Sequence, residues 1–186
     1  MQALIETIAG GLMLGALYAL FGLGLSLSLG VMKMINIAHG DLIVLGAYLC
    51  STVMQLLGTG PFISLLAVVP MMFVIGYVLQ RVLLNRVVGR GALSPLLLTF
   101  GLSIVLQNLL QEVYTADTRS LQAGEFALQG FDLGGVSIGL LPLVSTLISV
   151  AIFPGTSWLI GHSHLGRQAR AVADDPGTAR LVGVND

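Results

Sequence analysis

Five long apolar runs constrain the fold of this chain more than any other feature of its sequence. Each run is about 20 residues long or longer, which is the length that a helix needs to cross a lipid bilayer. The runs cover roughly residues 8–31, 37–57, 62–84, 95–113 and 136–160. Only 9% of the 186 residues are charged, whereas a soluble domain carries about 25%. We therefore predict an all-α, polytopic transmembrane helical bundle of about five spans.

The basic residues gather on one side of these spans. Seven of the eight lie at or after the ends of the first, third and fifth runs: Lys33, Arg81, Arg86, Arg90, Arg167, Arg170 and Arg180. Because cytoplasmic loops retain Lys and Arg, we predict that the N-terminus lies outside and the C-terminus in the cytoplasm. Residues 1–160 then form the transmembrane domain and residues 161–186 a cytoplasmic segment. The polar interval 114–135 is expected to hold a short extramembrane element.

Composition also excludes several functions. The net charge is −1, so nothing indicates nucleic acid as a partner, and the lipid bilayer is the surrounding that the apolar runs require. The one cysteine, Cys50, excludes an internal disulfide and a Cys-based metal cluster. No Gly-x-x-x-x-Gly-Lys-Ser/Thr loop is present to cradle phosphate. We expect no cofactor and no metal to be bound by this chain.

The first apolar run carries a regular pattern of small residues. They recur at intervals of three or four, at Gly11, Gly15, Ala19, Gly22, Ser26 and Gly30. At about 100° per residue they fall within roughly 100° of arc around a helix. A stripe of this kind allows another backbone to approach closely. We predict that the stripe packs against another helix, in this chain or in a partner.

Polar residues repeat every four positions in the fourth run. Thr99, Ser103, Gln107 and Gln111 share one side, and Asn108 lies beside them. Polar groups that face lipid are costly, so this side should meet protein or a wet cavity. Hydrogen bonding between helices and the lining of a solute path both fit the pattern.

The stretch "MKMINIAHGD" places Asn36, His39 and Asp41 between the first two runs. Three interpretations compete. His39 as a catalytic base or metal ligand lacks the additional ligands that a metal site needs. Asp41 near the start of the second helix would satisfy free backbone N–H groups. The polar residues and Gly40 would also suit a broken helix that cradles a polar solute. The last two interpretations remain equally open.

Three segments resemble the LivH-type permease family of branched-chain amino acid ABC importers. They are "GLMLGALYALFGLGLSLSLGVMKMINIAHGDLIVLGAY", "LLLTFGLSIVLQN" and "LGRQARAVADDPGTARLVGVN", in the expected order. The resemblance implies a multi-pass protein of the bacterial inner membrane that moves solute by ATP-driven alternating access. It implies as partners a second, LivM-like permease subunit, two cytoplasmic ATP-binding subunits and a periplasmic solute-binding protein. The chain itself is then not an enzyme.

The resemblance also implies that the cytoplasmic segment is a loop that couples the permease to the ATPase. Its residues in that role would be Gly166, Arg167, Arg170, Ala173, Asp174 and Gly183. A solvated loop that only anchors orientation is the alternative. His162 and His164 stand where relatives usually carry Arg. Relatives continue for about a hundred further residues with more spans, so we expect a fragment or a truncated gene.

The substrate is less constrained than the class. The resemblance favours branched-chain amino acids, while a urea or short-amide importer shares the same motifs. A different class, an intramembrane hydrolase that uses His39 with Ser26 or Ser28, would act without ATP or partners. On the transport interpretation the solute path includes Asn36, His39, Asp41, Thr99, Ser103, Gln107 and Asn108.

Overall fold

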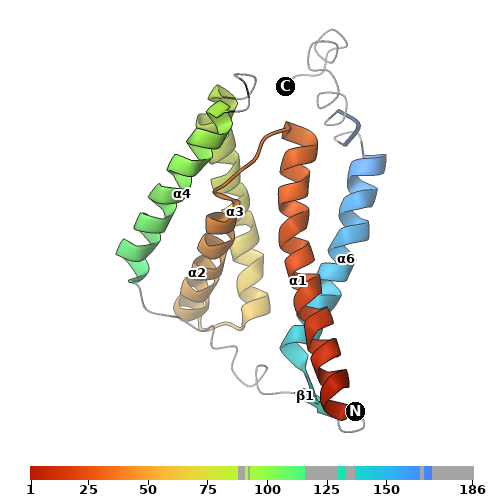
Figure 1. Cartoon of the computed structure of the whole chain (residues 1–186). Coiled ribbons are helices and arrows are strands. Elements are labelled where there is room, and N and C mark those ends of the chain that lie inside the picture. Colours follow the sequence, from red (N-terminus) through yellow and green to blue (C-terminus); the bar gives the residue numbers. More distant parts are fainter. Residues whose placement is uncertain (88–90, 92, 116–129, 133–136, 164–165, 169–186) are drawn as a thin grey trace. The chain divides into compact units, whose positions relative to one another are not determined.

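The protein is described here by a computed structural model that covers residues 1–87, 91, 93–115, 130–132, 137–163 and 166–168. Five helices in it are long and apolar enough to cross a membrane. They are α1 (Gln2–Met32), α2 (His39–Leu57), α3 (Pro61–Val82), α4 (Leu93–Tyr114) and α6 (Leu140–His162) (Figure 1). A 3-10 turn, η1 (Leu84–Arg86), follows α3. The prediction of an all-α polytopic bundle is confirmed, and a short hairpin is added to it.

Local chemistry explains where these helices begin and end. α1 has 31 residues, about 46 Å at 1.5 Å per residue, which is longer than the roughly 30 Å hydrocarbon core. The extra length lies at its N-terminal end, because α1 begins at Gln2, six residues before the apolar run. α1 stops at Lys33, whose φ of 51° is left-handed. α2 stops at Gly58, with φ of 61°, and Pro61 opens α3 as the first helical residue.

The chain divides into two compact units. The first contains α1, α6 and a two-stranded antiparallel hairpin of β1 (Gly130–Asp132) and β2 (Ser137–Gly139). α1 packs along α6, and both helices begin at the end that carries the hairpin (Figure 1). The two helices are therefore parallel, as the first and fifth spans of a five-span chain must be. β1 lies in the polar interval between the fourth and fifth runs.

The second unit contains α2, α3, η1 and α4. α2 packs against both α3 and α4. Its contact with α3 holds a small apolar core of Cys50, Val53 and Val68. On α4, the Tyr114 ring stacks on Tyr48 of α2, with ring centroids 4.4 Å apart.

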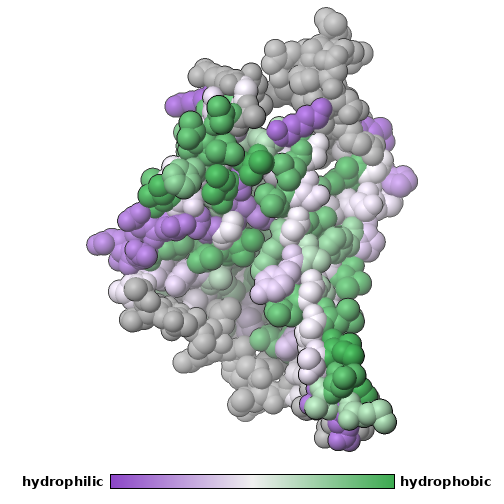
Figure 2. All heavy atoms as spheres, in the orientation of Figure 1, coloured by the Kyte–Doolittle hydropathy of each residue, from purple (hydrophilic) through white to green (hydrophobic). Residues whose placement is uncertain are grey.

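Apolar side chains remain on the outside of both units. Figure 2 shows them over much of the visible surface, and α1 has no buried residue. In water this exposure would be costly, because each apolar Å² costs about 25 cal/mol. In a bilayer the same surface meets lipid or other apolar helices. The surface therefore agrees with a multi-pass membrane protein.

Candidate functional site

A non-helical segment before α2 is fastened to α4 by one threonine. Thr99 of α4 is fully buried, and its hydroxyl accepts a hydrogen bond from the Ile37 backbone N–H at 3.2 Å. The same hydroxyl lies within donating distance of two carbonyls, that of Leu96 in its own helix at 3.2 Å and that of Ile35 at 3.4 Å. Met34 and Ala38 are buried on either side of this contact. The non-helical segment between α1 and α2 is thus held against α4 by the hydrogen bond from Ile37 to Thr99.

One turn further along, α2 and α4 are joined through Asp41. The Ser103 hydroxyl donates to one carboxylate oxygen of Asp41, and the Gln107 amide donates to the other at 3.0 Å. The Gln107 amide also donates to the Ser103 oxygen at 3.1 Å. Ser103 is buried, Asp41 half-buried and Gln107 exposed. We call these three residues the carboxylate cluster.

The carboxylate cluster holds a charge with no cation to balance it. Within the described part of the chain, both partners of Asp41 are neutral side chains. An ionised group inside a membrane span is costly, and such groups face a protein interior or a wet pathway. A carboxylate accepts about four hydrogen bonds, and Asp41 has used two of them. The site can therefore receive a further donor, above all a positively charged one.

This geometry corrects one of the interpretations of Asp41. The residue lies in the first turn of α2, but no side chain caps that helix by a hydrogen bond. The carboxylate turns instead toward α4, because two donors on the neighbouring helix bind it. Asp41 still lies where the positive end of the helix dipole favours a negative charge. The structure therefore contradicts the backbone cap, which was one part of an interpretation that the sequence left open, and it shows a pairing with α4 instead.

Asn36 and His39 lie in the segment before the carboxylate cluster and at the start of α2. The side-chain oxygen of Asn36 is buried and has no hydrogen-bond partner among the described residues. The backbone N–H of His39 donates to the Asn36 carbonyl at 3.3 Å, and His39 makes a further interaction. No group of three His, Cys, Asp or Glu side chains that could hold a metal occurs in the described residues.

The polar side of α4 changes character along the helix. Thr99 and Ser103 are buried, while Gln107, Asn108 and Gln111 are exposed. Asn108 donates to the Ile104 carbonyl of its own helix at 2.7 Å. Interhelical hydrogen bonding is thus observed for Thr99, Ser103 and Gln107. The lining of a solute path by this side of α4 stays a prediction.

The small-residue stripe of α1 lies on the face of that helix opposite the start of α6. At about 100° per residue, the residues of α1 that line a cavity against α6 are centred about 180° from the stripe. All six stripe residues are exposed. A Cβ built on Gly11, Gly15, Gly22 or Gly30 meets no heavy atom of the described chain within 4 Å. The stripe packing therefore stays a prediction.

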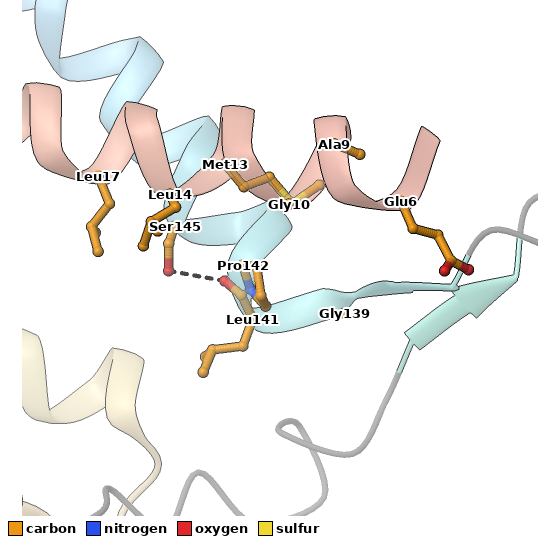
Figure 3. Close-up of a pocket in the computed structure, with 10 residues that line it drawn as sticks. All are labelled: Glu6, Ala9, Gly10, Met13, Leu14, Leu17, Gly139, Leu141, Pro142 and Ser145. Atoms are coloured by element: carbon orange, nitrogen blue, oxygen red, sulfur yellow. Dashed lines mark hydrogen bonds between the residues drawn. The ribbon is translucent and has the colours of Figure 1, made fainter. Parts of the chain in front are cut away.

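The cavity between α1 and α6 was not predicted. It measures about 500 Å³, and its walls come from Glu6, Ala9, Gly10, Met13, Leu14 and Leu17 of α1 and from Gly139, Leu141, Pro142 and Ser145 (Figure 3). The Ser145 hydroxyl donates to the Leu141 carbonyl at 2.9 Å. The walls are otherwise mostly apolar. The sequence hinted at this cavity only through Glu6, an acidic residue close to the start of an apolar run.

The structure describes only the beginning of residues 161–186, the segment predicted to be cytoplasmic. The Gly166 backbone N–H donates to the Ser163 hydroxyl at 2.9 Å, and the Arg167 guanidinium donates to the His162 carbonyl at 2.8 Å. Arg167 thus bonds to the last turn of α6. The other predicted coupling residues, Arg170, Ala173, Asp174 and Gly183, lie outside the described residues.

A family model described as "Branched-chain amino acid transport system / permease component" matches residues 7–186. The chain belongs to this family. Its five apolar helices are therefore those of a permease component. No solved structure matches the chain significantly.

Three relatives illustrate the similarity to this permease family. The high-affinity branched-chain amino acid transport system permease protein BraD of Pseudomonas aeruginosa is 30% identical over 192 residues, which cover 97% of this chain and 62% of BraD. The high-affinity branched-chain amino acid transport system permease protein LivH of Escherichia coli is 26% identical, and the match covers 97% of this chain and 62% of LivH. A probable branched-chain amino acid transport permease LivH of Methanocaldococcus jannaschii is 27% identical, with 96% and 58% covered. The chain thus spans about three-fifths of the length of these relatives.

Proposed function

We propose that this chain is a membrane-spanning permease subunit of an ABC importer and that it translocates the branched-chain amino acids Leu, Ile and Val. Membership of the permease family supports the class of protein. The names of BraD and LivH support the solute. The structural observation that carries the proposal is the carboxylate cluster, in which Asp41 of one span is bound by Ser103 and Gln107 of another.

The carboxylate cluster favours an amino acid over urea. A zwitterionic amino acid brings an ammonium group, whose three N–H donors suit a carboxylate with unused acceptor capacity. Urea is neutral and gains less from such a site. The exposed amides of Gln107, Asn108 and Gln111 continue the polar surface beyond Asp41. The solute path then follows the polar side of α4, past the segment that holds Asn36 and His39.

The remaining parts of the mechanism follow from the importer class. Two permease subunits enclose the path, this chain and a LivM-like partner, and a periplasmic binding protein delivers the solute. Two cytoplasmic ATP-binding subunits drive the change between outward and inward access. The N-terminus lies outside and residues 161–186 face the ATPase, as the distribution of Lys and Arg favours. The location is the bacterial inner membrane.

Labelled leucine uptake tests the proposal. Proteoliposomes contain the chain with its partner permease, the ATP-binding subunits and the solute-binding protein. Uptake is measured with ATP, without ATP, and with excess unlabelled urea. We expect ATP-dependent leucine uptake that urea does not reduce.

The other results each have a definite meaning. Urea accumulation without leucine uptake would keep the permease and replace its solute. Uptake of neither compound would contradict the importer assignment. Hydrolysis of an intramembrane substrate by the chain alone, lost on His39→Ala, would support the hydrolase instead.

A further inference from the structure

The cavity between α1 and α6 is an elongated groove rather than a compact pocket. On α1 it runs from Glu6 to Leu17, eleven residue steps, or about 16 Å at 1.5 Å per residue. In Figure 3 the lining residues of α1 run from Glu6, near the strand that leads into α6, to Leu17, past the turn that opens α6. The groove thus begins near the start of both helices and continues along α1, while Ser145 is the last residue of α6 that lines it.

Its length matches one leaflet of a bilayer. The hydrocarbon core is about 30 Å thick, so the chains of one leaflet reach about 15 Å. Both helices begin at one end of the unit, beside the hairpin, and that end lies at the membrane surface if they span the bilayer. An acyl chain that enters there runs along the groove to its far end. Leucine is much shorter and would leave most of the groove empty.

The lining is apolar along the groove and acidic at its mouth. Met13, Leu14, Leu17 and Leu141 supply most of the apolar wall. Glu6 stands at the end nearest the hairpin, with its carboxylate toward the strand that leads into α6 (Figure 3). Glu6 already makes an interaction, and a carboxylate retains acceptor capacity beyond one bond. An ammonium group at this position would complement its charge.

Gly10 lines the groove without a side chain of its own. A Cβ built on Gly10 meets nothing within 4 Å, so its place in the wall is open rather than filled by a neighbour.

We propose that the groove between α1 and α6 binds one phospholipid with an amine headgroup, of the phosphatidylethanolamine class. The ammonium lies at Glu6, and one acyl chain lies against Met13, Leu14 and Leu17. This inference concerns a site separate from the carboxylate cluster and does not depend on which solute the importer carries.

Lipid retention tests the assignment. The chain is reconstituted in nanodiscs with equal amounts of phosphatidylethanolamine and phosphatidylglycerol of the same acyl chains, then extracted into mild detergent. Retained lipid is measured by mass spectrometry. Three variants are compared: Glu6→Gln removes the charge, Gly10→Leu fills the groove, and Gly155→Leu places the same side chain on α6 outside it. A Cβ on Gly155 also meets nothing within 4 Å, so this control matches Gly10→Leu.

We expect the wild-type chain to retain phosphatidylethanolamine in preference. Glu6→Gln should lower the ratio of the two lipids by about two- to fivefold, the effect of an exposed ion pair. Gly10→Leu should lose the retained lipid, and Gly155→Leu should keep it. Equal retention by Gly10→Leu and wild type would overturn the site. An unchanged ratio in Glu6→Gln would overturn the headgroup, and displacement by excess leucine would make the groove a solute site instead.

Discussion

At the scale of single residues, Asp41 shows how a charge is accommodated inside a span. Its carboxylate is bound by a hydroxyl and an amide from α4 rather than by a basic side chain. Neutral donors reduce the cost of the charge without neutralising it. The negative charge therefore remains available to a cation, which a buried salt bridge would not allow. This property makes Asp41 the most informative position at which to test the transport path.

Asp41→Asn should reduce leucine uptake at limiting leucine by about tenfold or more, because a hydrogen bond to a charged group contributes about 1.5–3 kcal/mol. Asp41→Glu keeps the charge and should retain more activity. Glu112→Gln removes an exposed acid from the end of the same α4 and should leave uptake unchanged. Initial rates are measured in assembled proteoliposomes, with the amount of assembled complex checked for each variant. Normal uptake by Asp41→Asn would remove Asp41 from the path.

Thr99 is the residue at which we expect a loss of stability rather than of chemistry. Thr99→Val keeps the shape of the side chain but leaves the part-buried Ile37 N–H without its acceptor. An unsatisfied buried group costs about 1–3 kcal/mol, or about 2–12 °C in melting temperature for a domain of this size. Thr99→Ser retains the hydroxyl and should recover most of the difference. Thermal unfolding in detergent measures the difference in melting temperature. Equal melting temperatures of Thr99→Val and wild type would contradict a role of Thr99 in stability.

At the scale of helices, sequence periodicity predicted faces but not neighbours. The four-residue spacing placed Thr99, Ser103 and Gln107 on one side of α4 correctly. It gave no sign that Asp41, more than sixty positions earlier, would meet that side, because spacing within a helix says nothing of which helix packs beside it. The groove between α1 and α6 was missed for a similar reason. Its apolar walls look like any other membrane-facing residues until two helices are brought together.

The stripe on α1 remains a prediction at this scale, and Gly15→Leu tests it. A Cβ at Gly15 has open space in the described chain, so the substitution causes no clash within the helix pair α1–α6. If a helix of the same chain covers the stripe, the melting temperature of the isolated chain should fall. If a partner subunit covers it, co-purification of that subunit should fall instead. Gly155→Leu serves as the control, and no change in either measurement would place the stripe against lipid.

At the scale of the whole molecule, the directions of the helices agree with a chain whose successive spans cross the membrane in opposite directions. α1 runs parallel to α6, and α2 runs parallel to α4, since Asp41 meets Ser103 while Thr52, further along α2, bonds to Tyr114 at 2.9 Å. First and fifth spans, and second and fourth, must each run the same way in a five-span chain. The last span therefore ends on the side opposite the start of α1. The distribution of Lys and Arg predicts that this side is cytoplasmic, and residues 161–186 follow on that side.

Residues 161–186, the predicted cytoplasmic segment, are proposed to couple the permease to the ATPase. Residues 165–185 should retain the ATP-binding subunit through charged contacts across the interface, so deletion of this stretch should abolish co-purification of that subunit. Arg170→Ala or Asp174→Ala should weaken it severalfold. Membrane insertion should be unaffected, because the five apolar helices lie outside the deleted stretch. Arg167→Ala is the informative comparison: the Arg167 side chain bonds to the end of α6, so its loss should matter less than that of Arg170. Unchanged retention after the deletion would move the ATPase contact to the loops after α1 or α3, the other positions on the cytoplasmic side.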